Sequence, residues 1–567
     1  MGAASLSSTT GNAVKAKEML DDVEPGLTRP NSASPGQPSE QFQVHGTRRE
    51  IKTRHAQMLA IGGSIGTNLF IGVGQVLAVG GPGLLLLAFG LMAIFVYGMV
   101  TLICELGSFV PVPGNSMSAL GSRFISRSMG FAMGWLYFYS FAIIVAYELA
   151  AMVIIIDYWP NNINPAVWIS VGFIFFLVLN LCPVGVYGES EFWFTLVKII
   201  MATGLLLLSL VLMLGGGPTH DRLGYRYWYD PGAVKSYIVD GAGGRFTAFL
   251  YIWVYSGFSF FFAPEQLILA SGEMVNPRKN LPSASRRFFF RLVFFYVLGA
   301  AAVGVICPSN APGLTSGAGN ADASPWVIAI SSAGIDVLPS IINAGILTAA
   351  LSAGNAYLYM SSRALFSLAT VGDAPKVFTR CTSWGIPLYA ILASSCFGFL
   401  GFLVLNTEAG QVFNWFISIT NTAGYTSWIA CCVIYFRFRK ACAEKGVTPP
   451  YRSAIQPYAA RICIVVFSIL LLCNGFTVFY PGRFTASGFL TTYIGIPIFA
   501  ALWLGHKFTA GRHDPWWLSI SDIDLVTGVA QADAEAEMWN ALEKEREDSK
   551  SANKWTNPFN KVRALWS

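Results

Sequence analysis

Residues 57–79 (QMLAIGGSIGTNLFIGVGQVLAV) form an apolar stretch that is long enough to cross a bilayer but poorly suited to a continuous helix. A hydrocarbon core of roughly 30 Å needs about 20 apolar helical residues. The stretch holds five glycines, and a glycine inside a helix costs about 1 kcal/mol relative to alanine. Ser64, Thr67 and Asn68 add polar side chains at mid-depth. A spanning segment can leave helical geometry only where its backbone faces protein or a water-filled cavity, so the sequence predicts a broken helix.

The backbone of such a break would suit an anionic group. Its free N–H groups, from Ser64 to Thr67, can hold an anion, and the half-helix that follows would turn its positive end toward it. The alternative is a glycine-rich face that packs closely against another helix. Glycine alone would favour packing, whereas the polar side chains at the same depth favour the break.

Composition places the chain among polytopic membrane proteins. Of its 567 residues, 54% are hydrophobic and 12% are charged, and the mean hydropathy of +0.52 is far too high for a soluble protein of this size. The net charge of +6 gives no reason to expect a nucleic-acid partner. Because the cysteines and histidines show no metal-ligand spacing and no nucleophile motif is present, we expect no metal, no cofactor and no enzymatic activity.

Hydropathy predicts twelve membrane spans. They are expected at residues 57–79, 84–110, 128–156, 166–183, 190–214, 247–271, 287–307, 340–370, 387–405, 411–436, 459–480 and 488–507. Residues 1–47 are rich in Ser, Pro, Gly and Thr and are expected to form a disordered cytoplasmic tail. Residues 48–507 are expected to form the membrane domain, and residues 508–567 a second cytoplasmic tail.

The positive-inside rule predicts that both termini are cytoplasmic. Lys and Arg gather in the loops after spans 2, 6, 8 and 10, whereas residues 157–165, 308–339 and 406–410 contain none. Two loops run against this pattern. Residues 215–246 carry four basic side chains but should lie outside, and the loop after span 4 is acidic (Glu189, Glu191) but should lie inside.

The sixth span carries a second helix breaker. Pro264 lies mid-span beside Glu265, and an interior proline removes one backbone hydrogen bond and clashes with the preceding turn. Breaks at corresponding positions in two halves of a chain indicate an inverted-repeat transporter with a site near the bilayer midplane. A simple proline kink is the alternative, and the matched position favours the site.

Four ionisable residues inside the spans narrow the site further: Glu105, Glu148, Lys198 and Glu265. Ionisable groups at this depth are costly and by default functional. A buried lysine can gain or lose a proton near neutral pH, or stand in for a fixed sodium ion, but a lysine near a span end can also snorkel to the interface. For Lys198 these interpretations stay open. Glu265 is expected to be functional, and Glu105 and Glu148 to pair with neighbouring helices.

Several motifs, in this order, resemble the fungal amino acid permeases, the yeast branch of the amino acid–polyamine–organocation superfamily. The matching segments, within about 48–530, are RHAQMLAIGGSIGTNLFIGVG (54–74), YGESEFWFTLVKI (187–199), PEQLILASGEMVNPRKNLPSASRR (264–287), NAGILTAALSAGNAYLYMSSRALFSLA (343–369), VFNWFISITNTAGYTSW (412–428) and SDIDLVTG (521–528). The resemblance implies an all-α membrane protein of twelve transmembrane helices. Two inverted five-helix repeats of the LeuT-like fold (about 57–214 and 247–436) would precede two C-terminal helices (about 459–507).

The resemblance also implies roles for individual residues, because members of this family carry amino acids into the cell, usually with a proton. The implied contacts of the substrate carboxylate are Ser64, Ile65, Gly66 and Thr67. Those of the ammonium group are the unwound backbone around Ser259, Phe260, Phe261 and Phe262, with Glu265 beside them. The other implied roles are outer gating by Phe258, Phe260 or Phe261, proton coupling by Lys198, and pocket lining by Thr420 and Asn421.

Four positions depart from the pattern of that family. Ala263 and Pro264 stand where Gly and Thr are usual, Asn68 stands where a second glycine is frequent, and Phe260 replaces a small residue. These changes would stiffen and narrow the pocket. The leading hypothesis is a proton-coupled amino acid importer of the plasma membrane. The alternatives are a polyamine or carnitine carrier and a non-transporting nutrient receptor.

Overall fold

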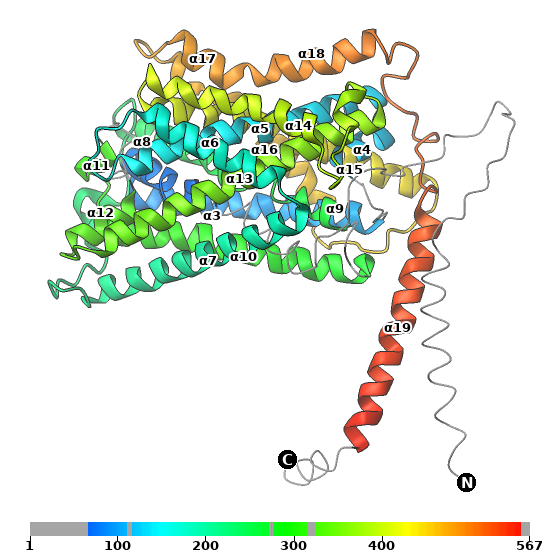
Figure 1. Cartoon of the computed structure of the whole chain (residues 1–567), viewed down its shortest axis with the longest axis horizontal. Helices are drawn as coiled ribbons and strands as arrows, with labels where there is room; N and C mark the ends of the chain where they lie inside the picture. The colour runs from blue at the N-terminus through cyan, green and yellow to red at the C-terminus, as the bar shows by residue number, and fades with distance from the viewer. Residues whose placement is uncertain are drawn as a thin grey trace, which may run out of the picture. The chain divides into compact units, whose positions relative to one another are not determined.

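The computed structural model describes residues 66–109, 111, 116–271, 274, 276–315 and 324–556, and every regular element within them is helical. The predictions for residues 1–47 and for Ser64 and Ile65 lie outside the described residues. The long helices run roughly side by side (Figure 1). An all-helical fold agrees with the sequence prediction, and the two-repeat arrangement stays a prediction.

The first half of the described chain extends to the second helix interruption. Its elements are η1 (Thr67–Leu69), α3 (Gly72–Phe109), α4 (Met117–Phe124), α5 (Arg127–Ile156), α6 (Pro165–Leu181), α7 (Val184–Leu214), η2 (Trp228–Gly232), α8 (Gly241–Ser256) and η3 (Gly257–Ser259). The elements that follow are α9 (Gln266–Ser271), α10 (Pro277–Ile306), α11 (Pro312–Thr315), α12 (Pro325–Ser332), α13 (Leu338–Val371), η5 (Lys376–Thr379), α14 (Leu388–Ser395), η6 (Cys396–Leu405), α15 (Ala409–Glu444), α16 (Tyr458–Cys473), η7 (Phe476–Phe479), α17 (Ala486–Tyr493), α18 (Gly495–Phe508) and α19 (Val529–Thr556).

Several described helices are long and apolar enough to cross a membrane. The six single helices that meet both conditions are Thr67–Phe109, Arg127–Ile156, Val184–Leu214, Pro277–Ile306, Leu338–Val371 and Leu388–Leu405. The pair α17 and α18, bent by 46°, would make a seventh span. Two shorter apolar helices, α6 and α16, lie at the fourth and eleventh predicted spans. These helices support a membrane protein with several spans, and the count of twelve stays a prediction.

Gly81 separates the first two predicted spans inside α3. Its φ of 80° lies in the left-handed region, which favours glycine, and Pro82 follows. A Cβ at Gly81 would lie 2.9 Å from the carbonyl oxygen of Ala233, and the N–H of Gly83 donates to the same oxygen at 2.8 Å. The chain therefore turns at this point, and a distant loop packs directly against the turn.

That loop, residues 215–246, carries the basic side chains that run against the positive-inside rule. Lys235 donates hydrogen bonds from Nζ to the backbone oxygens of Ala78 and Ser309, at 2.8 and 3.1 Å. Arg226 forms a two-pronged ion pair with Asp221. Because Lys235 and Arg226 have partners within the protein, local contacts account for their presence in this loop. Their positive charges therefore do not indicate which side of the membrane the loop faces.

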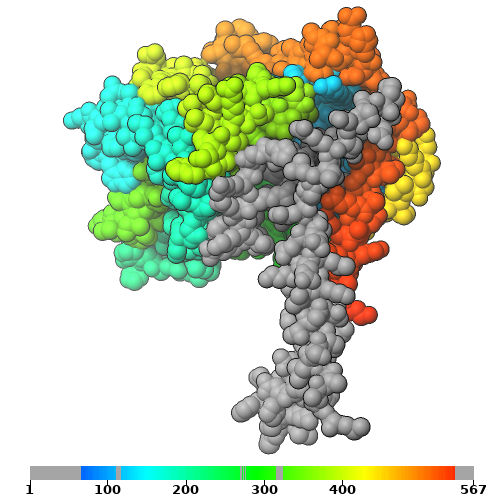
Figure 2. Space-filling model, turned by 45° about the vertical axis from the view of Figure 1, so that its right-hand side comes forward, coloured from blue at the N-terminus to red at the C-terminus, as the bar shows by residue number. Residues whose placement is uncertain are grey.

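Two groups of helices pack most closely in the interior. Helix α5 packs against α13 and α15, while α3 packs against α8 and α10. By contrast, α6 and α7 expose large apolar side chains at helical spacing, including Val167, Val171, Ile174 and Val178 on α6. An apolar face of this kind suits contact with lipid. The α6–α7 region and the α14–η6 region lie next to each other on the surface seen in Figure 2.

The segment after α18 is anchored to the helix ends. The N–H of Leu518 donates to the backbone oxygen of Ile125 at 2.8 Å. Lys445 donates from Nζ to the oxygen of Ile523 at 2.6 Å, and Arg123 donates from Nε to the oxygen of Asp524 at 2.7 Å. The side chain of Ile523 is fully buried. The beginning of the predicted C-terminal tail is therefore packed against the helical domain.

Candidate functional site

The described chain begins at Gly66, inside the segment where the sequence predicts the first helix interruption. Gly66 has extended backbone angles (φ −106°, ψ −171°), and the next three residues form the 3-10 turn η1. The backbone oxygen of Thr67 accepts hydrogen bonds from the N–H groups of Phe70 and Ile71, at 3.0 and 2.9 Å. Regular α-helix begins only at Gly72. This late start of regular α-helix agrees with the predicted break, and the segment 66–71 is named the first interruption; the residues before Gly66 lie outside the described part of the chain.

The second interruption lies between α8 and α9. Helix α8 ends at Ser256, η3 covers three residues, and irregular turns lead to the start of α9 at Gln266. Phe262 has φ of 63°, a left-handed conformation that is strained for a bulky side chain. This change of direction goes well beyond a proline kink. Strained backbone of this kind clusters at functional sites, where the surrounding structure holds it in place.

The two interruptions touch each other. Asn68 in η1 donates from Nδ2 to the Ser259 hydroxyl oxygen in η3 at 2.6 Å. The Tyr255 hydroxyl donates to Asn68 Oδ1 at 3.2 Å. All three side chains are buried. The sequence marked Asn68 only as a polar residue at mid-depth, because its partners lie almost 200 residues away in the chain.

Glu148 of α5 lies directly against the first interruption. The Thr67 hydroxyl donates to Glu148 Oε2 at 3.0 Å, and a Cβ at Gly66 would lie 3.3 Å from Glu148 Oε1. The prediction that Glu148 pairs with a neighbouring helix is therefore incomplete, since its neighbour is the broken segment itself. Its position inside a span was the signal that could have placed it in the site.

Lys198 of α7 is fully buried, so the snorkelling interpretation is wrong. Its ammonium group interacts electrostatically with both Glu148 and Glu191. Glu191 was predicted to lie in a loop, but α7 begins seven residues earlier, at Val184, and Glu191 is buried. Its Oε1 accepts a hydrogen bond from the Ser352 hydroxyl at 2.8 Å. Two buried carboxylates therefore flank one buried ammonium group beside the first interruption.

Glu265 joins the second interruption to two other helices. Its Oε1 accepts a hydrogen bond from the Ser427 hydroxyl of α15 at 3.0 Å. The Tyr137 hydroxyl of α5 lies 2.7 Å from the same Ser427 oxygen. The backbone break is thereby connected to α5 and α15 through a chain of side chains.

The four phenylalanines of the second interruption, at position 258 and positions 260–262, pack against different partners. Phe260 packs between Phe89 and Tyr296, with ring centroids 6.4 and 5.1 Å away. Phe261 packs against Tyr425 and Trp428 of α15, and Phe262 against Phe141 of α5. Phe258 lies 5.0 Å from the ring of Tyr147, the residue next to Glu148. Among these rings, Phe258 is the one that contacts Tyr147, the aromatic side chain beside Thr67.

Thr420 and Asn421, predicted to line the pocket, are buried in α15. Asn421 donates from Nδ2 to Asn474 Oδ1 at 3.4 Å. This contact leads toward the segment after α16 and not toward either interruption. The structure therefore brings Gly66, Thr67 and Ser259 together but gives no hydrogen bond between Asn421 and that group.

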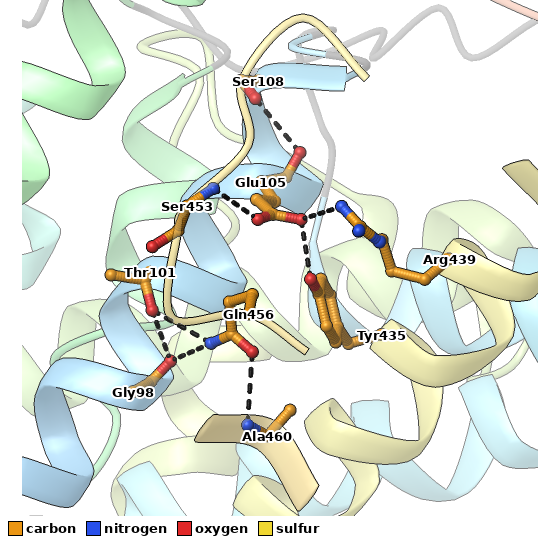
Figure 3. Close-up of polar contacts among 9 residues, drawn as sticks. All are labelled: Gly98, Thr101, Glu105, Ser108, Tyr435, Arg439, Ser453, Gln456 and Ala460. Carbon is orange, nitrogen blue, oxygen red and sulfur yellow. Dashed lines mark hydrogen bonds and ion pairs between the residues drawn. The ribbon is translucent and has the colours of Figure 1, made fainter. Parts of the chain in front are cut away.

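Glu105 pairs with a neighbouring helix, as the sequence predicted (Figure 3). Its Oε2 accepts hydrogen bonds from the Tyr435 hydroxyl at 2.7 Å and from Arg439 at 3.1 Å, both on α15. Its Oε1 accepts from the backbone N–H of Ser453 at 2.7 Å. Beside it, Gln456 bonds to the Gly98 oxygen of α3. Both carboxylate oxygens are hydrogen-bonded, and these bonds join α3 to α15 and to the segment before α16.

We expect Glu105→Gln to lower thermal stability without changing substrate selectivity. The change removes a charge-assisted bond to Arg439 inside a buried network, and a hydrogen bond to a charged group contributes about 1.5–3 kcal/mol. The measurement is the melting temperature of the purified protein in detergent. Glu537→Gln, at an exposed position on α19, is the control. Equal melting temperatures for the two variants would contradict a structural role for Glu105.

The chain matches the family model described as "Amino acid permease" over residues 55–519. It is 44% identical to the proline-specific permease of Emericella nidulans over 86% of this chain and 89% of that protein. It is 39% identical to the proline-specific permease of Saccharomyces cerevisiae, over 86% of this chain and 80% of that protein. It is also 36% identical to the dicarboxylic amino acid permease of Saccharomyces cerevisiae, over 89% and 84% of the two chains.

Proposed function

This chain belongs to the amino acid permease family, and we propose that it imports amino acids across the plasma membrane by proton symport, with both termini cytoplasmic. The observation that carries the proposal is the direct contact between two interrupted helices in the protein interior. Interrupted helices near the bilayer midplane form the binding sites of many secondary transporters.

The proposed site recognises both charged ends of a zwitterion. The backbone N–H groups of the first break (Ser64, Ile65, Gly66, Thr67) and the positive end of the following half-helix would bind the carboxylate. The backbone carbonyl groups around Ser259, Phe260, Phe261 and Phe262 would bind the ammonium group. Phe258, which contacts Tyr147 beside the first break, is the best placed of the predicted gating rings.

Proton coupling is proposed to act through Lys198. Its ammonium group interacts electrostatically with Glu148, which bonds to Thr67 and thus leads to the carboxylate end of the site. A change of protonation in this group would alter the hydrogen bond that ties the first break to α5. Alternating access would then move the group containing α3, α8 and α10 against the group containing α5 and α13, two sets of helices that each pack closely within themselves.

The names of the most similar relatives bear on the substrate. Two of them are named proline-specific permeases, so we propose that proline is among the amino acids carried. A polyamine would leave the anion-binding break without a partner, which disfavours a polyamine carrier. A carnitine carrier and a nutrient receptor would both retain a zwitterion site, so only an uptake assay separates them from an amino acid importer.

We expect a transport-deficient host that expresses this protein to take up labelled proline. Uptake should fall when a protonophore is added, because the proton gradient supplies the driving force, and replacing sodium should have no effect. The panel includes other amino acids, carnitine and spermidine, each measured in the same cells. Sodium-dependent uptake would contradict proton coupling, and uptake of spermidine without any amino acid would contradict the proposed substrate class. Proline binding at the cell surface without uptake would identify a receptor.

A further inference from the structure

Asn68 uses its whole side-chain amide to connect the two helix interruptions. Its Nδ2 bonds to Ser259, inside the second interruption, and its Oδ1 accepts from Tyr255, on the helical turn that precedes it. One side chain from the first break therefore forms two hydrogen bonds, one to the second break and one to the helical turn before it. Relative exposures of 3% for Asn68, 4% for Tyr255 and 5% for Ser259 keep water away from both bonds. Hydrogen bonds in such a low-dielectric interior keep more of their strength than exposed ones.

The neighbouring residue has a different partner. Thr67 bonds to Glu148 on α5, which packs with the other group of helices, whereas Asn68 bonds only to residues of α8 and η3. The two consecutive side chains of the first break thus divide their contacts between the two packing groups. The Tyr255 bond lies within the group of α3, α8 and α10, whereas η3, which carries Ser259, packs against both α8 and α15.

Gly72 provides the space for this arrangement. A Cβ at Gly72 would lie 1.8 Å from Asn68 Oδ1 and 2.6 Å from the Tyr255 hydroxyl. The first turn of α3 therefore fits closely around the asparagine amide, and the amide has little freedom to adopt another position. This close fit holds the Asn68 amide in place and thereby holds the two breaks at one spacing.

We propose that Asn68 is a positioning residue that sets the distance between the two helix interruptions and thereby selects zwitterions whose amine and carboxylate share one carbon atom. This inference rests on the proposed function, in which the first break binds the carboxylate and the second binds the amine. Inserting one carbon between the two groups adds a bond of about 1.5 Å. A site with fixed spacing cannot accommodate that change at both ends, whereas a site without the Asn68 bonds can widen.

The test compares proline with β-proline, an isomer in which the amine and the carboxylate are separated by one more carbon. We would measure uptake of labelled proline and its inhibition by each unlabelled isomer, for the wild type, Asn68→Gly, Ser259→Ala and the double variant. We expect each single variant to reduce the preference for proline over β-proline by about threefold to tenfold, because each change removes one or two buried hydrogen bonds. The double variant should show no further reduction beyond that of Asn68→Gly, because Asn68→Gly already removes the bond to Ser259.

Matched variants separate positioning from general damage. Asn343→Ala removes another buried asparagine, on α13, whose side chain donates to the Ile155 oxygen at 2.8 Å. This change should leave the isomer preference unchanged. Ser259→Thr keeps the hydroxyl and should restore the preference. If Asn68→Gly does not reach the membrane, Tyr255→Phe, which removes only one of the two bonds, should still reduce the preference.

The outcomes distinguish this inference from the proposed function. A wild type that takes up no amino acid would overturn the proposed function. A wild type that prefers proline, with the same preference in the surface-expressed Asn68, Ser259 and Tyr255 variants, would overturn the positioning role alone. A preference reduced equally by Asn343→Ala would also overturn it, because the effect would then come from general loosening of the helices.

Discussion

Gly66→Val is expected to abolish uptake while leaving the protein at the cell surface. A Cβ at this position would already lie 3.3 Å from Glu148 Oε1, and valine adds two methyl groups beyond it. They would press against the carboxylate and push the backbone of the first break away from Glu148. Since a displacement of about 1 Å at a site can cost about 100-fold in rate, we expect a loss of at least that order. The measurement is initial uptake of labelled proline, normalised to surface protein.

Gly90→Val is the matched control for this prediction. Gly90 lies in α3, the helix that follows the first break, and a Cβ there meets no atom within 4 Å. The same change of residue at this position should therefore leave uptake close to that of the wild type. Normal uptake by Gly66→Val at equal surface expression would show that the first break does not bind the substrate.

The helix interruptions could be predicted from the sequence because their causes are local. Glycines and polar residues within an apolar span, or a proline beside a glutamate, mark a break wherever the neighbouring helices lie. What each break contacts could not be predicted in this way. Asn68 and Ser259 are far apart in the chain, and no periodic pattern relates them. The same limit explains why Glu148 was assigned to ordinary helix pairing.

Two further errors have physical explanations. Glu191 was assigned to the acidic loop after span 4, yet Ser352, from a distant helix, gives this carboxylate a partner inside the protein. The directions of Phe258, Phe260 and Phe261 could not be predicted either. Side-chain directions follow a period of 3.6 residues only in a regular helix, and these rings lie where the helix has ended.

Lys198→Arg is expected to remove the pH dependence of uptake while preserving a folded, surface-expressed protein. Arginine keeps the positive charge between Glu148 and Glu191, but its guanidinium group does not release a proton under physiological conditions. If Lys198 carries the coupled proton, uptake by the variant should be low and nearly constant between about pH 5 and 8, the range over which such groups are tuned to act. If Lys198 only replaces a fixed sodium ion, arginine should preserve the pH profile, which would contradict its proposed role.

Lys198→Ala separates the loss of charge from the loss of proton exchange. Removing the ammonium group leaves two buried carboxylates, Glu148 and Glu191, without their shared cation. Breaking a buried ion pair in this way costs about 3–5 kcal/mol, so this variant should also lose thermal stability, unlike Lys198→Arg. Lys376→Ala, at an exposed position, is the control for both measurements. A pH profile in Lys198→Ala that matched the control would exclude Lys198 from coupling, whatever its effect on stability, because no titrating group would remain at that position.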